Sequence, residues 1–118
     1  MAFEIKNGLG TVTVDDEVVS RVAGYAALEC YGIVGMAAKS TTDGLVQLMR
    51  MENLSRGVKV TSNGDKVDID LYIIVEYGIS IAAAAGSIIN TVKYRVEKLT
   101  GVTVGRVNIR IEDIRVQI

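Results

Sequence analysis

The segment GVKVTSNGDKVDIDLYIIVEYG, residues 57–78, decides the fold class of this chain. On both sides of Asn63-Gly64, aliphatic side chains alternate with polar and charged ones, which is the pattern of half-buried strands. Asn-Gly is also the pair favoured in two-residue type I′ hairpin turns. If these two residues form the loop, Val60 faces Val67, and the apolar faces of the two strands match. We therefore expect an antiparallel hairpin with one buried face.

The second strand of this hairpin is expected to carry two different faces. One face starts at Asp68, which the same register places opposite Lys59 as a compatible charge pair. Tyr72 and Ile74 then make part of this face apolar, so we expect another segment to cover that part. The core face consists of alternate residues along the strand: Leu71, Ile73, Val75 and Tyr77.

A long helix is predicted after the hairpin, with Ser80 as its N-cap and Gly101 at its end. A strand that turns through glycine into a helix is also how phosphate-binding loops are built. Here the P-loop lysine is missing, and Gly78 and Gly86 lack the spacing of phosphate-binding or dinucleotide-binding motifs. We interpret the small residues 82–86 as allowing close packing on the sheet, with a weak anion site near Ser80 as the alternative. The apolar stripe that needs a sheet face is Ile81, Ala85, Ile88, Ile89, Val92, Val96 and Leu99.

The N-terminal half is predicted to contain one strand and two helices. The strand is Thr11–Val14, and either Asp15 or Asp16 caps the helix that follows. Gly32 is placed to end that helix in a left-handed conformation. Residues 33–44 are predicted to be an irregular connection, and residues 45–55 a short helix. The apolar stripe of the first helix is Val18, Val19, Val22, Ala23, Ala26 and Cys30.

The last predicted strand lies within residues 102–118, and its apolar alternation changes phase at Glu112-Asp113. Such a change predicts a bulge or a bend. The order of elements predicts one α+β domain over residues 1–118, with a small antiparallel or mixed sheet and helices mainly on one face. The alternating apolar residues are Val107, Ile109 and Ile111, then Ile114, Val116 and Ile118.

Composition limits the chemistry that this chain can perform. Of its 118 residues, 49% are apolar but only 5% aromatic, and the net charge is −1. This balance gives no long-range attraction for nucleic acid or an anionic membrane. The absence of histidine removes serine–histidine–aspartate and cysteine–histidine catalysis and every histidine-containing zinc site. We therefore expect a protein that is not an enzyme, with no catalytic, metal or cofactor-binding residues and no cofactor.

Location is expected to be cytoplasmic. Cys30 is the single cysteine, which fits a reducing compartment, and its place on the helix stripe favours a buried, inert thiol over a nucleophile. The N-terminal residues MAFEIKNGLG lack the pattern of a signal peptide. The longest apolar stretch, residues 79–89, is too short to span a bilayer. Any contact with a membrane would therefore be peripheral and through a partner, without direct insertion.

Three surfaces are candidates for partner binding. One lies on the last strand, where two arginines on one face form an anion-binding or partner-binding strip, or protect an edge strand from stray pairing. The second is the apolar part of the hairpin's outer face. The third is a methionine-containing surface of the short helix, for which a core contact is the alternative. The strip on the last strand consists of Arg106 and Arg110. The apolar part of the hairpin's outer face consists of Tyr72 and Ile74, and the surface of the short helix contains Met49 and Met51.

The remaining motifs favour structural roles. Gly32 and Gly35 match the G-x-x-G spacing of nucleic-acid-binding KH domains, but the inner residues are apolar, so nucleic-acid binding is the weak alternative. Several carboxylates could do acid–base work or hold a divalent metal, but a solvated strand face is the favoured interpretation. These carboxylates are Asp68, Asp70 and Glu76, together with Glu112 and Asp113.

Four segments together resemble the alkaline shock protein family, also called the general stress or envelope-stress family of Gram-positive bacteria. They are GTVTVDDEVVSRVAGYAALECYGIVGM, DGLVQLMRMENLSRGVKV, VDIDLYIIVEYGISI and VKYRVEKLTGVTVGRVNIRIEDIRV. The resemblance covers nearly the whole chain, is most specific at DLYIIVEYG and VNIRIEDI, and is closest to the short members.

The resemblance implies a non-enzymatic protein of stress response and cell-envelope homeostasis that acts through protein–protein contacts. It implies self-association into a homo-oligomer, and recruitment by a membrane-anchoring protein. It also suggests an alternative role as an accessory or regulatory subunit of a neighbouring lipid or dihydroxyacetone-type kinase. The family has no agreed catalytic residues, so none is carried over to this chain.

Overall fold

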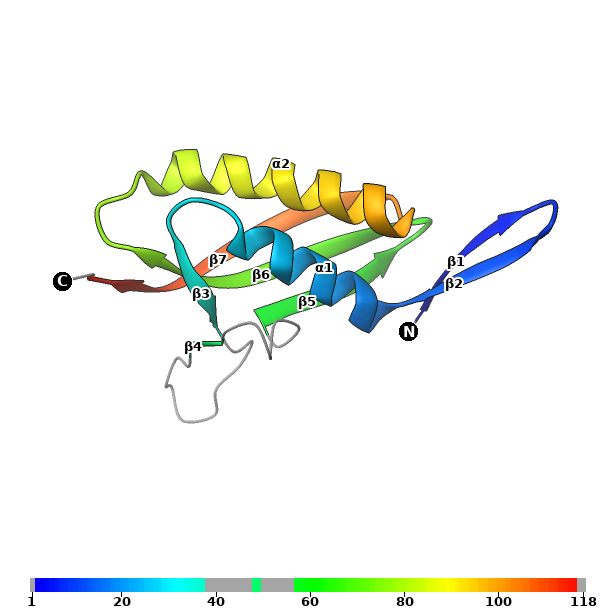
Figure 1. The fold of residues 1–118 in the computed structure, drawn as a ribbon, viewed down its shortest axis with the longest axis horizontal. Coiled ribbons are helices and arrows are strands. Elements are labelled where there is room, and N and C mark those ends of the chain that lie inside the picture. The colour runs from blue at the N-terminus through cyan, green and yellow to red at the C-terminus, as the bar shows by residue number, and fades with distance from the viewer. Residues whose placement is uncertain (1, 38–47, 50–56, 117–118) are drawn as a thin grey trace.

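The structure, a computed structural model, describes residues 2–37, 48–49 and 57–116. Two helices lie on one face of a sheet, and a separate two-stranded hairpin extends from one end (Figure 1). The elements in chain order are β1 (Ala2–Asn7), β2 (Gly10–Asp15), α1 (Asp16–Leu28), β3 (Ile33–Ala37), β4 (Leu48–Met49), β5 (Val58–Asn63), β6 (Lys66–Glu76), α2 (Ile81–Thr100) and β7 (Val104–Arg115).

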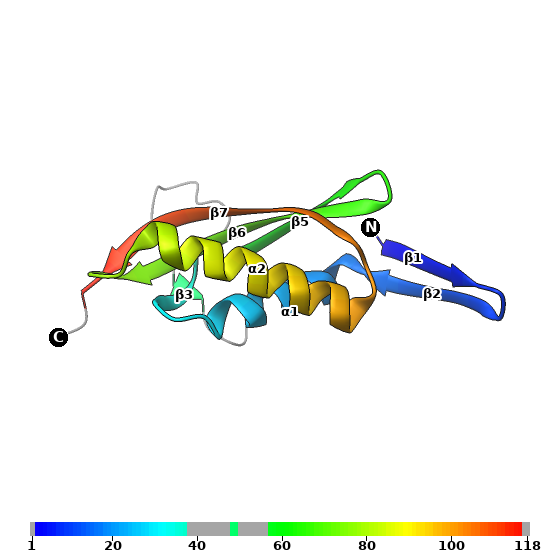
Figure 2. The same cartoon turned by 90° about the horizontal axis from the view of Figure 1, so that it is seen from above.

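β6 is the central strand of the main sheet. Along one edge it pairs antiparallel first with β5 and then with β3, and along the other edge it pairs parallel with β7. β4 extends the sheet beyond β3. Helix α2 connects the parallel strands β6 and β7 and covers the same face as α1 (Figure 2). The predicted α+β class, with a mixed sheet and helices on one face, is confirmed.

The core lies between the helices and one face of the sheet. Alternate residues of β6 are fully buried there, and α1 and α2 contribute one stripe each. Aliphatic and alanine side chains dominate it, so close packing of small shapes holds the layers together. The fully buried residues of β6 and α2 in this cluster are Val67, Ile69, Leu71, Ile73, Val75, Ile88, Val92 and Val96.

The β5–β6 hairpin forms, but its predicted register is wrong by two residues. The loop is Gly64-Asp65, and Gly64 has a φ of 68°, so glycine supplies the left-handed position at the start of the loop. Val60 therefore pairs with Ile69, and Lys59 with Asp70. A two-residue shift leaves every side chain on the same face, so matching of apolar faces could not distinguish the two registers.

The N-terminal half differs most from the sequence-based expectation. β1 pairs with β2 in a hairpin where only the second strand was predicted. The predicted irregular connection contains β3, which pairs with β6. Leu48 and Met49, predicted to be helical, form strand β4 opposite Ala37 and Met36, and the rest of that predicted helix lies outside the described residues. Pairing between distant segments decides these strands, and local patterns do not report it.

The helix ends follow the sequence more closely. Asp15 and Ser80 cap α1 and α2 as predicted, and Gly101 ends α2 in the left-handed conformation. Gly32 also has a positive φ, 88°, but α1 ends earlier, at Leu28, so Gly32 serves the turn into β3. The predicted stripe of α2 is buried only in its middle.

Three large residues expected in the core are exposed instead. Ile81 and Leu99, at the two ends of α2, are 40% and 67% exposed, and Tyr77 is 70% exposed just beyond the end of β6. Leu99 lines a groove between α1 and α2, so helical spacing alone did not show that it is left uncovered.

The predicted bulge in β7 is confirmed. Ile111 pairs with Ile73 and Asp113 with Ile74, which leaves Glu112 as the extra residue. A second shift lies at Gly105, where an added Cβ would be 2.8 Å from Asp68 Oδ1. Between the two bulges, the pairing of β7 with β6 is regular.

Candidate interaction surfaces

The face of the sheet opposite the helices carries polar side chains from three neighbouring strands. Register places Arg106 beside Asp68, and Asn108 beside Asp70. We call this surface the polar sheet face. Its residues are Lys59 and Thr61 on β5, Asp68, Asp70 and Tyr72 on β6, and Arg106, Asn108 and Arg110 on β7.

Hydrogen bonds within the sheet engage the carboxylates of this face. Asp68 accepts from the Arg106 backbone N–H at 3.1 Å and from Asn63 Nδ2 at 3.2 Å. Asp70 accepts from Asn108 Nδ2 at 2.8 Å. The carboxylate of Asp68 therefore helps to hold the β7 bulge at Gly105 in place. This structural role fits the predicted solvated strand face.

The other carboxylates considered from the sequence are dispersed. Asp113 forms an ion pair with Arg115 at 2.9 Å, while Glu76 is half-buried at the end of β6 and Glu112 is exposed at the bulge. Within residues 2–37, 48–49 and 57–116, the structure contains no group of three or more cysteine and acidic side chains arranged to hold a metal ion.

Two arginines of the polar sheet face have no carboxylate partner among the described residues. Arg106 and Arg110 are both exposed on β7. The guanidinium of Arg110 lies 6.0 Å from the centre of the Tyr72 ring, a cation–π distance. The structure therefore brings Arg106, Arg110 and Tyr72 together on one surface, whereas the sequence analysis had assigned them to two separate candidate surfaces.

The other three predicted partner-binding residues are not part of this surface. Ile74 is fully buried, so its side chain does not reach solvent. Met49 lies in β4 opposite Met36, and Met51 is outside the described residues.

The predicted G-x-x-G segment is packed into the fold. The Gly32 carbonyl accepts from the Glu76 N–H at 2.9 Å, and Gly35 is buried in β3 opposite Ile74. A Cβ at Gly32 would be 2.7 Å from Cδ1 of Ile79. This arrangement differs from the solvent-exposed loop that a backbone clamp requires, so it does not favour nucleic-acid binding there.

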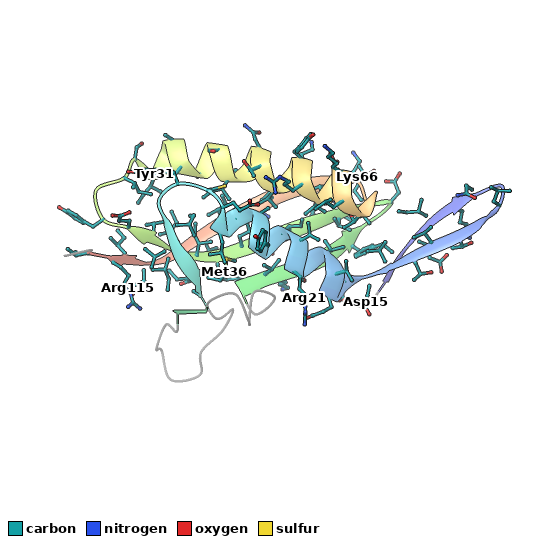
Figure 3. All side chains as sticks on the ribbon, viewed as in Figure 1. Asp15, Arg21, Tyr31, Met36, Lys66 and Arg115 are labelled. Carbon is teal, nitrogen blue, oxygen red and sulfur yellow. The ribbon has the colours of Figure 1, made fainter. Side chains whose placement is uncertain are left out.

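The start of α2 lies beside an open groove of about 400 Å³ at the end of the molecule opposite the hairpin. Ser80 Oγ accepts from the Ala83 N–H at 3.4 Å, which satisfies one free donor of the first turn. Among the described residues, no charged side chain lines the groove, whose wall includes the exposed Tyr31 (Figure 3).

A second groove lies between α1 and α2 on the side away from the sheet. It has a volume of about 280 Å³, and we call it the helix groove. The exposed Tyr25 and Leu99 lie on opposite walls, and Arg95 forms an ion pair with Glu29 at 2.7 Å. It is lined by Arg21, Val22, Tyr25, Ala26, Arg95 and Leu99.

Sequence reasoning missed the helix groove because it counted Leu99 and Val22 as core residues. The spacing of Val18, Val22 and Tyr25 could have indicated a second apolar stripe on α1. Val18 is 46% exposed, consistent with such an outward stripe. Cys30, by contrast, is half-buried, with its Sγ 3.5 Å from the carbonyl of Ala26.

The β1–β2 hairpin extends away from the body of the molecule (Figure 2). Phe3 pairs with Val14 and Ile5 with Val12, which gives the hairpin one apolar face. Phe3 and Val14 contact the core, but Val12 is half-exposed. Leu9, at the tip, is fully exposed. A two-stranded hairpin is marginally stable alone in water, so the apolar surface at its tip is suited to a partner.

Comparison with known proteins decides the family. The model of the alkaline shock protein 23 family, which is described as having a cell envelope-related function, matches residues 4–116. The chain belongs to this family. The resemblance seen in the sequence is thereby confirmed, and stress and cell-envelope biology is the setting of the family.

Relatives of this chain are found in Gram-positive bacteria. It is 44% identical to the uncharacterized protein YloU of Bacillus subtilis and 34% identical to the uncharacterized protein Spy1614 of Streptococcus pyogenes. The alignments cover 98% of this chain in both cases, and 98% and 97% of the two relatives. A Streptococcus pyogenes stress response regulator gls24 homolog is 28% identical over 90% of this chain and 59% of its own length. No solved structure matches the chain.

Among the described residues, neither helix is long and apolar enough to cross a membrane.

Proposed function

We propose that this member of the alkaline shock protein family is a non-enzymatic interaction protein of cell-envelope homeostasis and the stress response, and that it self-associates. The family setting gives the biological context. The observation that carries the proposal is the exposed apolar surface: Leu99 in the helix groove is 67% exposed, and Leu9 at the hairpin tip is fully exposed. Apolar side chains gathered at a groove are typical of surfaces that bind proteins.

The helix groove is the proposed self-association surface. Its apolar walls include Tyr25 and Leu99, and a copy packed over it would remove both side chains from water. Arg21 and Arg95 lie at the groove, each with a carboxylate partner, Glu17 at 3.4 Å and Glu29 at 2.7 Å. Such pairs suit the polar rim of an interface, where charge contributes more to specificity than to affinity.

Sedimentation equilibrium of the purified protein tests this proposal. We expect mass to rise with concentration for the wild type, and the self-association constant of Leu99→Asn to be weaker by about tenfold, because a central apolar contact contributes about 1–2 kcal/mol. Tyr94→Asn is the matched control, because Tyr94 is also exposed on α2 but does not line the groove.

Two outcomes would contradict self-association through this groove. One is a wild-type protein that stays monomeric at every concentration reached. The other is an equal loss of association in Tyr94→Asn and Leu99→Asn, because a change outside the groove should have little effect. Thermal unfolding of both variants provides the folding control, since both side chains are exposed and both changes should be tolerated.

Recruitment to the membrane, in this proposal, occurs through a protein partner, and the protein itself remains cytoplasmic. The formal charge of −1 supports this, because it gives no long-range attraction to an anionic surface. On the polar sheet face, the arginines are accompanied by Asp68 and Asp70, which also makes it a poor surface for a phosphate backbone.

A further inference from the structure

The outer edge of β7 is open in the part of the chain that the structure describes. β7 pairs with β6 along one side, and no described strand pairs with it along the other (Figure 2). It runs for 12 residues, longer than the usual strand of about 5–6 residues. An unpaired edge presents backbone N–H and C=O groups to which another extended segment can add as a strand.

The part of β7 between its two bulges, residues 106–111, has two chemically different faces. On the polar sheet face, Arg106 and Arg110 point to solvent without carboxylate partners among the described residues. On the helix side, Ile109 and Ile111 pack against the core but are only half-buried. An added strand would therefore meet two cations on one face and two incompletely covered aliphatic side chains on the other.

Strand β6, which already pairs with β7, shows which sequence pattern fits beside it. On the inner side, β6 places Asp68 beside Arg106 and Leu71 beside Ile109. β6 thus alternates acidic and aliphatic residues over positions 68–71, and Tyr72 takes the third outward position, opposite Arg110. A segment with the same alternation would repeat this complementarity on the outer side.

A second copy of β7 does not meet this requirement. Added antiparallel over the same run and centred on Asn108, it would place Arg106 opposite Arg110 at both positions. Like charges directly opposite each other in a sheet are destabilising. In this register the arginines would therefore reject an identical strand while attracting an acidic one, and rejection together with attraction is how specific interfaces choose partners.

We propose that the outer edge of β7 binds an extended segment of a partner protein that alternates acidic and aliphatic residues, added as a further strand of the sheet. The acidic side chains pair with Arg106 and Arg110, and the aliphatic ones cover Ile109 and Ile111. This inference rests on the proposed role in protein binding, but it concerns a different surface from the helix groove and can fail independently of self-association.

Fluorescence anisotropy with dye-labelled synthetic peptides tests the proposal. The first probe alternates glutamate and valine, and the second has lysine in place of every glutamate. Wild-type protein should bind the glutamate peptide, with affinity falling as salt rises, and bind the lysine peptide at least about tenfold more weakly. Arg106→Glu/Arg110→Glu should reverse this preference, because it exchanges the sign of both partners.

Lys59→Glu is the matched control. Lys59 is an exposed cation on the same polar sheet face, but it lies on β5, across β6 from the proposed edge. Its reversal should change the affinity for the glutamate peptide by less than about threefold, because the charge is two strands away and screened. Arg110→Gln provides a milder variant that removes charge without adding repulsion, and circular dichroism confirms folding of each variant.

Hydrogen exchange tests whether the bound peptide is added as a strand, because attraction between charges alone would not protect backbone N–H groups. Binding of the glutamate peptide as a strand should slow exchange of alternate backbone N–H groups between Arg106 and Ile111, because they gain hydrogen bonds. Three results would overturn the proposal: no binding of the glutamate peptide by the wild type, equal binding of both peptides, or binding without slower exchange in β7. None of them affects self-association, which the sedimentation experiment measures separately.

Discussion

Replacing Gly32 by alanine should destabilise the protein much more than the same change at Gly78. Both glycines have positive φ, 88° and 102°, so an alanine at either position is strained by about 1–2 kcal/mol. At Gly32, the added Cβ would also be 2.7 Å from Cδ1 and 3.2 Å from Cγ2 of Ile79. Overpacking of this kind costs about 1–3 kcal/mol. At Gly78, nothing lies within 4 Å of the added Cβ.

The expected loss in free energy of unfolding is therefore about 2–5 kcal/mol for Gly32→Ala and about 1–2 kcal/mol for Gly78→Ala. Urea unfolding followed by circular dichroism measures both values. A double-mutant cycle with Ile79→Ala separates the clash from the backbone strain, because removing the Ile79 side chain beyond Cβ relieves only the clash. The double variant should be more stable than the sum of the two single losses indicates.

Equal losses for the two glycine variants, or a strictly additive cycle, would refute this reasoning. Either result would mean that Gly32 does not pack against Ile79 as described. The experiment also bears on the G-x-x-G motif, because it tests whether Gly32 is needed for packing rather than for binding a nucleic-acid backbone.

Three further predictions concern the core, a helix cap and the β7 bulge. Ile88→Ala should lower the free energy of unfolding by about 2–5 kcal/mol, whereas Leu99→Ala should change it by less than about 0.5 kcal/mol, and urea unfolding compares them. The Glu17 backbone N–H holds the pKa of the Asp15 carboxyl below its ordinary value. The stability advantage of wild type over Asp15→Ala should therefore be complete at neutral pH and shrink as pH falls below about 4, which thermal unfolding across pH measures; an advantage that grows in acid would contradict it. Asp68→Ala should cost about 1 kcal/mol and speed exchange of the β7 amides, and unchanged exchange would contradict its role at the bulge.

Local signals in the sequence predicted where both helices begin and where α2 ends, but not the end of α1, which lies at Leu28. The carboxylate of Asp15 and the hydroxyl of Ser80 accept hydrogen bonds from the first turns, and Gly101 adopts the left-handed conformation in which glycine is favoured. Each of these interactions lies within a few residues of the chain, so the neighbouring sequence contains the information. The bulge at Glu112 was predictable for the same reason, because it shifts the apolar alternation within one strand.

Non-local pairing was harder to predict. β3 is a strand because its residues pair with β6, which lies far along the chain. The hairpin register failed because a shift of two residues conserves both faces, and the turn geometry at Gly64 decided between the two possibilities. Leu99 fits the helical stripe of the core, but it is 67% exposed in the helix groove, and helical spacing does not report which side chains the neighbouring helix leaves uncovered.

The sequence predicted only part of the candidate surfaces, because local alternation shows which residues share a face but not which of them are buried. Alternation placed Arg106 and Arg110 on one face of β7, and the structure brings Tyr72 beside them. Ile74 belongs to the same face by alternation but is fully buried, which alternation alone could not show. The helix groove depends on how α1 and α2 approach each other, so only the three-dimensional arrangement could reveal it.

Affinity capture of the tagged protein from native lysate, with and without nuclease, tests the central claim most directly. If the protein acts through protein–protein contacts, mass spectrometry should identify the same defined set of proteins after nuclease treatment, including untagged copies of the chain itself. If nuclease abolishes the capture and nucleic acid is recovered in its absence, the protein-binding account is contradicted.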